Sequence, residues 1–152
     1  MIILAGGNSD ILGTWGDALR DSRQVSTASG FEELERMLAD GAAVCVAIER
    51  CQPHAELIEA VRRLHKLNPL AKIVLLSDPA RPCSDQEDLA FLKAGVCGFC
   101  RTDMDGDMIR KVLDAVDHGQ LWVQRRLIPL LIQELSRQAK GAIDVAPRAL
   151  DL

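Results

Sequence analysis

The chain has 152 residues, 48% of them hydrophobic and 26% charged, so it is long enough to bury the core of one domain. Its net charge of -4 and the lack of a basic block argue against a non-specific grip on nucleic acid by this segment. The sequence shows neither a signal stretch nor an apolar run of the roughly 20 residues that cross a bilayer. Five cysteines, an odd number, argue against a disulfide framework, so we expect a cytoplasmic protein without membrane contact.

Two hydrophobic periodicities alternate along the chain. Apolar runs without polar alternation are typical of buried parallel strands, and they occur at residues 1–4, 24–27, 43–48, 71–76 and 96–100. Apolar residues at helical spacing predict a helix after each run, around residues 11–19, 34–38, 57–64, 89–92 and 108–116. Five such units in one short domain imply a flavodoxin-like α/β fold, a doubly wound five-stranded parallel sheet with helices on both faces.

A further helical pattern follows the fifth unit. We expect a domain over residues 1–122, an extra C-terminal helix over 123–138, and a linker or tail over 139–152. The extra helix is apolar on more than one face, which is broad for packing against one domain edge. We therefore predict that it pairs two chains in a homodimer, the alternative being a helix that only closes the domain. The candidate dimer residues are Leu127, Leu130, Leu131 and Leu135.

Ligands of such sheets bind at the carboxyl ends of the strands, and there the sequence becomes specific. Residues 94–103 read AGVCGFCRTD, and the helical pattern 108–116 and then Gly119-Gln120-Leu121-Trp122 follow. This order resembles the last strand and helix of bacterial response-regulator receiver domains, in the NarL/FixJ (LuxR-type) branch. The resemblance extends over residues 1–135 and is strongest from residue 73 onward. It implies a regulatory module of two-component systems, which would contact DNA only through an output domain absent from this chain.

The chemistry of that family needs five groups at the strand ends. Two acids after the first strand help hold Mg²⁺, an aspartate ending the third accepts the phosphoryl group, and a Ser or Thr and a Lys end the fourth and fifth. By resemblance these positions fall, in that order, on Gly6 and Gly7, Glu49, Ser77 and Thr102, and the switch aromatic falls on Phe99. The family's proline, four residues after the aspartate, matches Pro53, whereas a shift of one residue would bring Arg101 to the lysine position.

Only Ser77 keeps the family's residue type among these five positions, so the resemblance implies a degenerate receiver, or pseudo-receiver, that is not phosphorylated. Two interpretations of Glu49 stay open: a fixed charge that imitates the phosphorylated state, and a solvated acid at a strand end. The alternative function is an atypical phosphoacceptor that uses Glu49 or Asp78. We expect no cofactor, no bound metal and no enzymatic activity, since we see neither a nucleophile–base pair nor a metal-ligand set.

The start of the extra helix carries a second candidate site. One subgroup of degenerate receivers binds cyclic di-GMP through a short motif, and Trp122 and Arg125 match two of its positions, while Val123 and Gln124 do not. An arginine can stack on a guanine base or bind phosphate through its planar fork. The alternative is that Trp122 plugs the end of the core and that the neighbouring arginines are solvated.

The cysteines and histidines suggest no site of their own. Cys97 and Cys100 have CxxC spacing, but residues three apart on an extended strand face opposite sides, so we predict core cysteines there and at Cys45. Cys51 and Cys83 are expected in loops at the strand ends. The histidines are scattered, and we predict a solvated surface position for all three: His54, His65 and His118.

Overall fold

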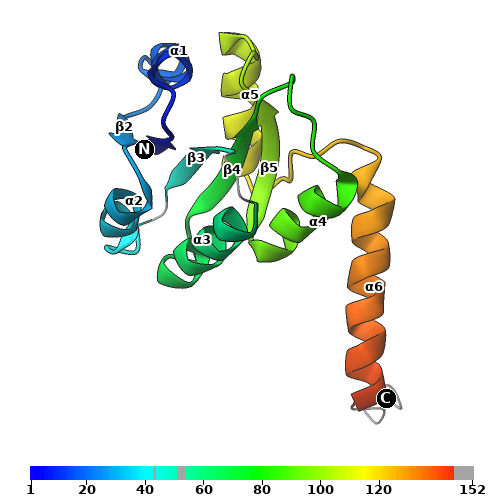
Figure 1. Ribbon diagram of the computed structural model, residues 1–152. Helices are drawn as coiled ribbons and strands as arrows, with labels where there is room; N and C mark the ends of the chain where they lie inside the picture. The colour runs from blue at the N-terminus through cyan, green and yellow to red at the C-terminus, as the bar shows by residue number, and fades with distance from the viewer. Residues whose placement is uncertain (43, 51–53, 146–152) are drawn as a thin grey trace. The chain divides into compact units, whose positions relative to one another are not determined.

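The computed structural model describes residues 1–42, 44–50 and 54–145, in which five strands form one parallel sheet with the order β2-β1-β3-β4-β5 (Figure 1). The strands are β1 (Ile2–Ala5), β2 (Val25–Ala28), β3 (Cys45–Glu49), β4 (Lys72–Ser77) and β5 (Val96–Arg101). The helices between and after them are α1 (Ser9–Leu19), α2 (Phe31–Leu38), α3 (His54–Leu67), α4 (Asp85–Ala94) and α5 (Gly106–Asp117). The predicted doubly wound parallel fold is confirmed. Cys51 and Pro53, which entered the sequence-based predictions, lie outside the described residues.

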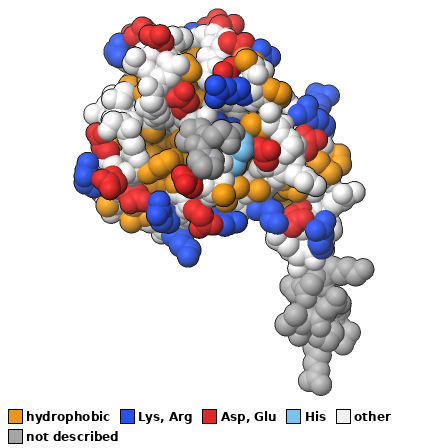
Figure 2. All heavy atoms as spheres, viewed as in Figure 1, with side chains coloured by type: hydrophobic (Ala, Val, Ile, Leu, Met, Phe, Trp, Pro, Cys, Tyr) orange, Lys and Arg blue, Asp and Glu red, His pale blue; other side chains and the backbone are white. Residues whose placement is uncertain are grey.

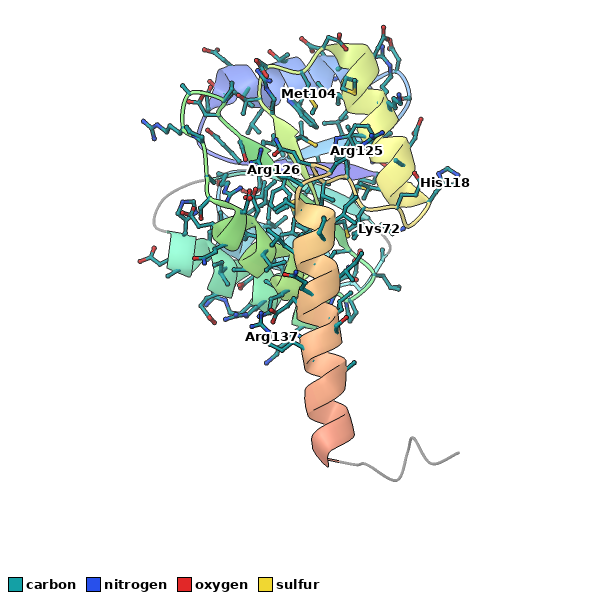
Figure 3. The ribbon with its side chains drawn as sticks, turned by 90° about the vertical axis from the view of Figure 1, so that its right-hand side faces the viewer. Lys72, Met104, His118, Arg125, Arg126 and Arg137 are labelled. Atoms are coloured by element: carbon teal, nitrogen blue, oxygen red, sulfur yellow. The ribbon has the colours of Figure 1, made fainter. Side chains whose placement is uncertain are left out.

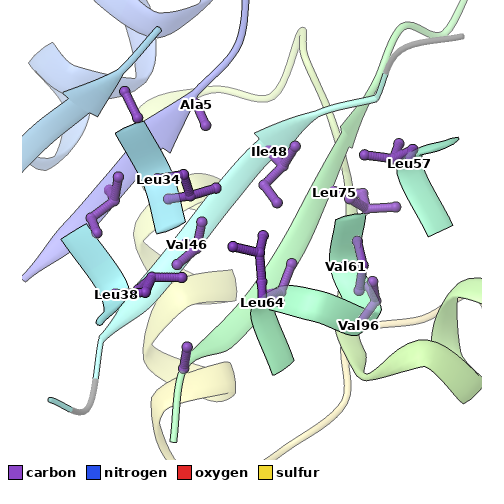
Figure 4. Packing of buried hydrophobic residues seen from close by; sticks show 14 of the residues in the cluster. Ala5, Leu34, Leu38, Val46, Ile48, Leu57, Val61, Leu64, Leu75 and Val96 are labelled. Atoms are coloured by element: carbon purple, nitrogen blue, oxygen red, sulfur yellow. The ribbon is translucent and has the colours of Figure 1, made fainter. Parts of the chain in front are cut away.

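Both faces of the sheet are covered, because alternate residues of each strand point to opposite sides. On one face, α2, α3 and α4 pack on a core that includes Leu34, Val46, Leu64 and Leu75 (Figure 4). On the other face, α1 and α5 pack on a core that includes Leu4, Trp15, Val74 and Val112. This two-sided burial explains why the strands read as continuous apolar runs in the sequence.

Polar residues fix the points at which helices leave the sheet. Asn8 Oδ1 accepts hydrogen bonds from the backbone N–H groups of Asp10 and Ile11 at 3.0 and 3.3 Å, which caps the start of α1. Ser84 and Asp105 cap α4 and α5 in the same way. The three helices therefore start at defined residues beside the carboxyl ends of the strands.

The fifth strand contains an irregularity that the sequence pattern does not reveal. Its register against β4 shifts at Cys97, which is an extra residue in the ladder before Gly98. The shift changes the alternation, so Cys97 and Cys100 pack against the same core, and the prediction that they face opposite sides is wrong. Cys45 and Cys100 are buried core cysteines, as predicted, and burial is the main cause that raises the pKa of each thiol to about 12.

Contacts to the last turn of α5 close the amino ends of the strands. Lys72 Nζ donates hydrogen bonds to the carbonyl oxygens of Val116 and Asp117 at 3.0 and 2.8 Å (Figure 3). His118 Nδ1 lies 2.6 Å from the carbonyl oxygen of Asp114, and its side chain is exposed, as predicted. A cation at a helix carboxyl end opposes the helix dipole, so Lys72 stabilises this end of the sheet.

The chain divides into two compact units, Met1–Trp122 and Val123–Leu152. The second unit contains α6 (Leu127–Val145), a helix of 19 residues. The helix begins at Leu127 rather than at residue 123, the start predicted from the sequence. It also ends later than predicted, because residues 139–145, predicted as linker or tail, are helical. None of the helices formed by the described residues is long and apolar enough to cross a lipid bilayer.

Acidic and basic side chains are interspersed on the face of the molecule drawn in Figure 2. Neither sign of charge gathers there into a large block.

Candidate functional site

The carboxyl ends of the strands bring the predicted pocket positions to one edge of the sheet. The register of β1 with β3, and of β4 with β5, leaves Gly6, Glu49, Ser77 and Thr102 at this edge. The strand order reverses between β1 and β3, and open α/β sheets bind their ligands at such a point. The candidate site is therefore the strand-end pocket, which we define by these four residues with Gly7 and Phe99.

The side chain of Glu49 fills the space beside Gly6. A Cβ atom at Gly6 would lie 2.5 Å from Glu49 Oε2 and 2.6 Å from Glu49 Cβ, so no side chain fits there without a shift. Glu49 Oε2 also accepts a hydrogen bond from the backbone N–H of Asn8 at 3.0 Å. This N–H lies at the start of α1, where the helix dipole favours negative charge. The half-buried carboxylate of Glu49 is thus held by the backbone of Asn8. The Glu49 side chain leaves no room for an acidic side chain at position 6.

A cavity of about 300 Å³ lies against this corner of the pocket, between the ends of β1 and β3 and the start of α2. It is lined by Ala5, Gly6, Gly7, Ser29, Gly30, Phe31, Ile48 and Glu49. Glu49 is the only charged residue among these lining residues. A phosphoryl group needs cationic neighbours, so this lining fits a small, mostly apolar group better than an anion.

Arg50, the residue after Glu49, belongs to a buried cluster that the sequence analysis did not predict. The side chain of Arg50 is only 5% exposed, and its Nη1 atom lies 2.7 Å from Asp88 Oδ1. The same nitrogen lies 3.5 Å from Ser77 Oγ, the outer limit of a hydrogen bond. Asp88, on α4, is buried as well. Buried charges are tolerated when they are paired, so Arg50 and Asp88 form a buried ion pair that joins the end of β3 to α4.

Arg50 also contacts two aromatic rings. Its Cζ atom lies 4.7 Å from the ring centroid of Phe91 and 5.5 Å from that of Phe99. A guanidinium within about 6 Å of a ring is attracted by the ring's electron-rich face. Phe99 and Ser77, the predicted switch aromatic and hydroxyl, therefore share Arg50 as a neighbour. Arg50 therefore lies beside the two positions at which the family's residue types are kept.

The lysine position of the family carries no lysine, and the nearby arginine is engaged elsewhere. Arg101 donates hydrogen bonds from Nε and Nη2 to the two carboxylate oxygens of Asp103, at 3.0 and 2.7 Å, and its side chain is 62% exposed. The hydrogen bond from Arg101 is the main cause that lowers the pKa of Asp103. Thr102 is half-buried, and its backbone N–H donates to the carbonyl oxygen of Ser77 at 3.0 Å. The Arg101 guanidinium is thus held at the surface by its own neighbour.

His54 lies in a half-buried corner, so the prediction of a solvated position is wrong for this histidine. Its side chain is 21% exposed, and Nε2 lies 2.8 Å from Glu87 Oε2. Cys83, in the loop after β4 as predicted, lies beside them, and the ligand-type atoms of the three side chains are within 4.8 Å of one another. Burial is the main cause that raises the pKa of the Cys83 thiol; Arg50 opposes the shift, and Glu87 and Asp88 add to it.

Trp122 continues the edge of the sheet beside β5. Its backbone N–H donates to the carbonyl oxygen of Cys97 at 3.0 Å, and its own carbonyl accepts from Phe99 N–H at 2.9 Å. The side chain is half-buried against the core under α1 and α5, which agrees with the alternative that Trp122 plugs the end of the core. Arg125 belongs to the second unit, where it is exposed and precedes α6 (Figure 3). Cyclic di-GMP binding through these two residues stays a prediction.

The exposed apolar residues of α6 differ in part from the predicted dimer residues. In the predicted set Leu127 is buried, Leu130 and Leu131 are half-buried, and Leu135 is exposed. Ile128, Ile132 and Leu135 are 44%, 57% and 56% exposed. Successive spacings of four and three residues put these three on one stripe of the helix.

Comparison with known proteins identifies the fold. No family model and no curated protein matches the sequence. Among solved structures, a CheY-like protein, TadZ, of Pseudomonas aeruginosa PAO1 matches with a TM-score of 0.63 and 20% identity, over 76% of this chain and 98% of that one. A LuxR-family DNA-binding response regulator of Silicibacter pomeroyi matches with a TM-score of 0.66 and 17% identity, over 83% and 98%. The isolated REC domain of RcsB from Salmonella enterica serovar Typhimurium, with the phosphomimetic BeF3-, matches with a TM-score of 0.65 and 15% identity, over 86% and 96%. The chain therefore has the fold of response-regulator receiver domains.

Proposed function

We propose that this chain is a signal-transduction module with a receiver fold that works without phosphorylation. Two copies would pair and so control an attached transcriptional output domain. The observation that carries the proposal is the side chain of Glu49, which fills the space beside Gly6 and bonds to the backbone of Asn8. A LuxR-family protein of the same fold is described as DNA-binding, which supports a transcriptional output made by another domain.

The missing charges argue against phosphoryl transfer in this pocket. The reaction needs a divalent metal held by acids, and a cation that neutralises the phosphoryl oxygens. Gly6 and Gly7 offer no carboxylate, and the space for one at position 6 is taken by Glu49. Arg50 and Arg101 both have carboxylate partners at 2.7 Å, Asp88 and Asp103. Moving either guanidinium to a phosphoryl group would break an ion pair.

Pairing of two copies would use the exposed stripe of α6. Ile128, Ile132 and Leu135 follow one another at spacings of four and three residues, the spacing that coiled coils bury between helices. Exposed apolar stripes are a solubility liability until something covers them. A second copy carries the same stripe, and a two-fold axis would make the contact self-complementary.

Incubation with acetyl phosphate and Mg²⁺, followed at once by intact mass spectrometry, tests the lack of phosphorylation. We expect no mass gain, because the acid pair and the lysine of the family are replaced by glycines and a threonine. A receiver domain that accepts phosphate from acetyl phosphate, treated in parallel, controls the reagent. A stable gain of one phosphoryl group, mapped to Glu49 or Asp78, would instead favour the atypical phosphoacceptor.

Sedimentation velocity tests the pairing separately. We expect the parent chain to be a dimer, and Ile132→Glu to be a monomer because it places a charge at the centre of the stripe. Gln133→Glu changes the next residue, also exposed but off the stripe, and should leave the dimer intact. A parent chain that remains monomeric at the highest attainable concentration would remove the pairing, whatever the phosphorylation result.

A further inference from the structure

Three side chains of different chemistry converge at the ends of β3 and β4. His54 is the first residue of α3, Cys83 lies in the loop after β4, and Glu87 is in the first turn of α4. Their ligand-type atoms all lie within 4.8 Å of one another, and all three residues are half-buried. His54 Nε2 lies 2.8 Å from Glu87 Oε2. Imidazole, thiol and carboxylate thus meet at one point of the fold.

The surrounding structure holds the helix turn that carries Glu87 and packs against the ring of His54. The backbone N–H of Glu87 donates to Ser84 Oγ at 3.1 Å, which fixes the first turn of α4. The ring of His54 meets the buried ring of Phe91 edge-on, with centroids 6.1 Å apart and 67° between the planes. Groups that orient ligands in this way are a regular part of metal sites, because they hold the donor atoms in place.

The charges in this corner favour an added dication. Arg50 Nη2 lies 3.9 Å from Glu87 Oε2, but the charge of Arg50 is balanced by Asp88 at 2.7 Å. The carboxylate of Glu87 would bring one negative charge to a bound ion, and the thiolate of Cys83 would bring a second. A divalent ion would neutralise both charges, and it would take the place of the thiol proton of Cys83.

We propose that His54, Cys83 and Glu87 bind a divalent transition-metal ion, and that zinc is the ion that fits these donors. Zinc takes thiolate, imidazole and carboxylate ligands, whereas Mg²⁺ and Ca²⁺ take oxygen ligands. Three protein donors leave the fourth tetrahedral position to water or another donor. The inference stands on the donor set alone and does not rest on the proposed function, because the site is distinct from the pocket at Gly6 and Glu49.

The geometry requires an adjustment on binding, because the three donor atoms are spread over as much as 4.8 Å and must converge on one ion. Metal–ligand lengths of about 2.0 to 2.3 Å with tetrahedral angles place donor atoms about 3.3 to 3.6 Å apart. The 2.8 Å between His54 Nε2 and Glu87 Oε2 is a hydrogen-bond distance, so these two atoms must separate by about 0.5 Å to admit the ion. Cys83 must lose its proton, so binding should release about one proton per ion near neutral pH.

Cobalt titration is the first test, because tetrahedral Co²⁺ with a thiolate ligand has visible bands and a near-ultraviolet charge-transfer band. Protein without a histidine tag, reduced with a phosphine, should develop these bands to one equivalent and lose them when Zn²⁺ is added. Competition with a chromophoric chelator then gives the zinc Kd. Cys83→Ser and Glu87→Gln should each raise it at least about tenfold, the loss seen even for residues that only orient a ligand.

Two matched variants control for unrelated donors. Cys97→Ser removes another half-buried thiol, and His118→Gln removes an exposed imidazole; neither should change the zinc Kd. Melting temperatures without metal establish that each variant is folded, and Glu87→Gln supplies the same test should Cys83→Ser fail to fold. A lack of cobalt bands, or equal zinc affinity of the parent and the two ligand variants, would overturn the proposal.

Discussion

The two halves of the strand-end pocket differ from the receiver pattern in different ways. On the β1–β3 side the side chains of the acid pair are missing at Gly6 and Gly7, and Glu49 extends into the space beside Gly6. On the β4–β5 side Ser77 and Phe99 keep the family's residue types, and Arg50 lies against both. The first half has glycines where the family has its acid pair, whereas the second keeps the hydroxyl and the aromatic ring, has Thr102 at the lysine position, and holds Arg50 as an added neighbour.

The two halves also differ in how deeply their charged side chains are buried and in how many partners they have. The carboxylate of Glu49 is half-buried and bonds to one backbone N–H, an arrangement of modest strength. The guanidinium of Arg50 is buried, paired with Asp88 and close to two rings. Substitutions on the Arg50 side should therefore cost much more stability than substitutions of Glu49.

The largest effect is expected for Arg50→Met. It leaves Asp88 as a buried carboxylate without its cation, and breaking a buried pair in this way costs about 3 kcal/mol or more. The measurement is the free energy of unfolding from urea titrations followed by circular dichroism. The double variant Arg50→Met/Asp88→Leu should recover much of the loss, because it removes both buried charges together.

Arg101→Met is the matched control for Arg50→Met. Both arginines contact an aspartate at 2.7 Å, but Arg101 is 62% exposed and Arg50 is 5% exposed. Exposed ion pairs contribute little because water screens them, so Arg101→Met should leave the urea midpoint unchanged. Equal losses in the two variants would show that burial does not distinguish the two pairs, and the contrast would fail.

An intermediate effect is expected for Gly6→Ala. The added Cβ would lie 2.5 and 2.6 Å from atoms of Glu49, so the glutamate side chain and backbone must shift. Overpacking of this kind costs about 1 to 3 kcal/mol. Gly7→Ala is the control, since a Cβ there meets nothing within 4 Å, and its effect should stay within about 0.5 kcal/mol. Equal urea midpoints for the two variants would mean that Glu49 does not restrict position 6.

The scaffold could be predicted from the sequence because its signals are local. Each strand is a short apolar run, and the spacing of apolar residues within each helix is visible in a few turns. The end of α6 was predicted too early, because Gly141 and the loss of apolar spacing read as a stop signal. Ala139, Lys140 and Ala142 are good helix formers, and their propensity agrees with the longer helix in the structure.

The strand-end pocket was predictable only in part. A family pattern locates Glu49 and Ser77, but no pattern reveals that Arg50 is buried, because its partner Asp88 lies 38 residues away. One weak signal was available: Asp88 precedes Phe91 by three residues and so shares its face of α4. The group of His54, Cys83 and Glu87 was missed for the same reason, since only the sheet topology brings its three segments together.

The smallest effect is expected for Glu49→Gln, and it tests the role of the charge itself. Glutamine can still accept the hydrogen bond from Asn8 N–H, so the variant removes only the interaction of the negative charge with the start of α1. An anion at a helix N-terminus contributes about 0.3 to 1 kcal/mol at low ionic strength, and the variant should lose stability in that range. Urea titrations of parent and variant at low and high salt provide the measurement. The difference should shrink at high salt, because mobile ions screen a half-exposed charge. A loss as large as that of Arg50→Met would mean that the two halves of the pocket contribute equally to stability.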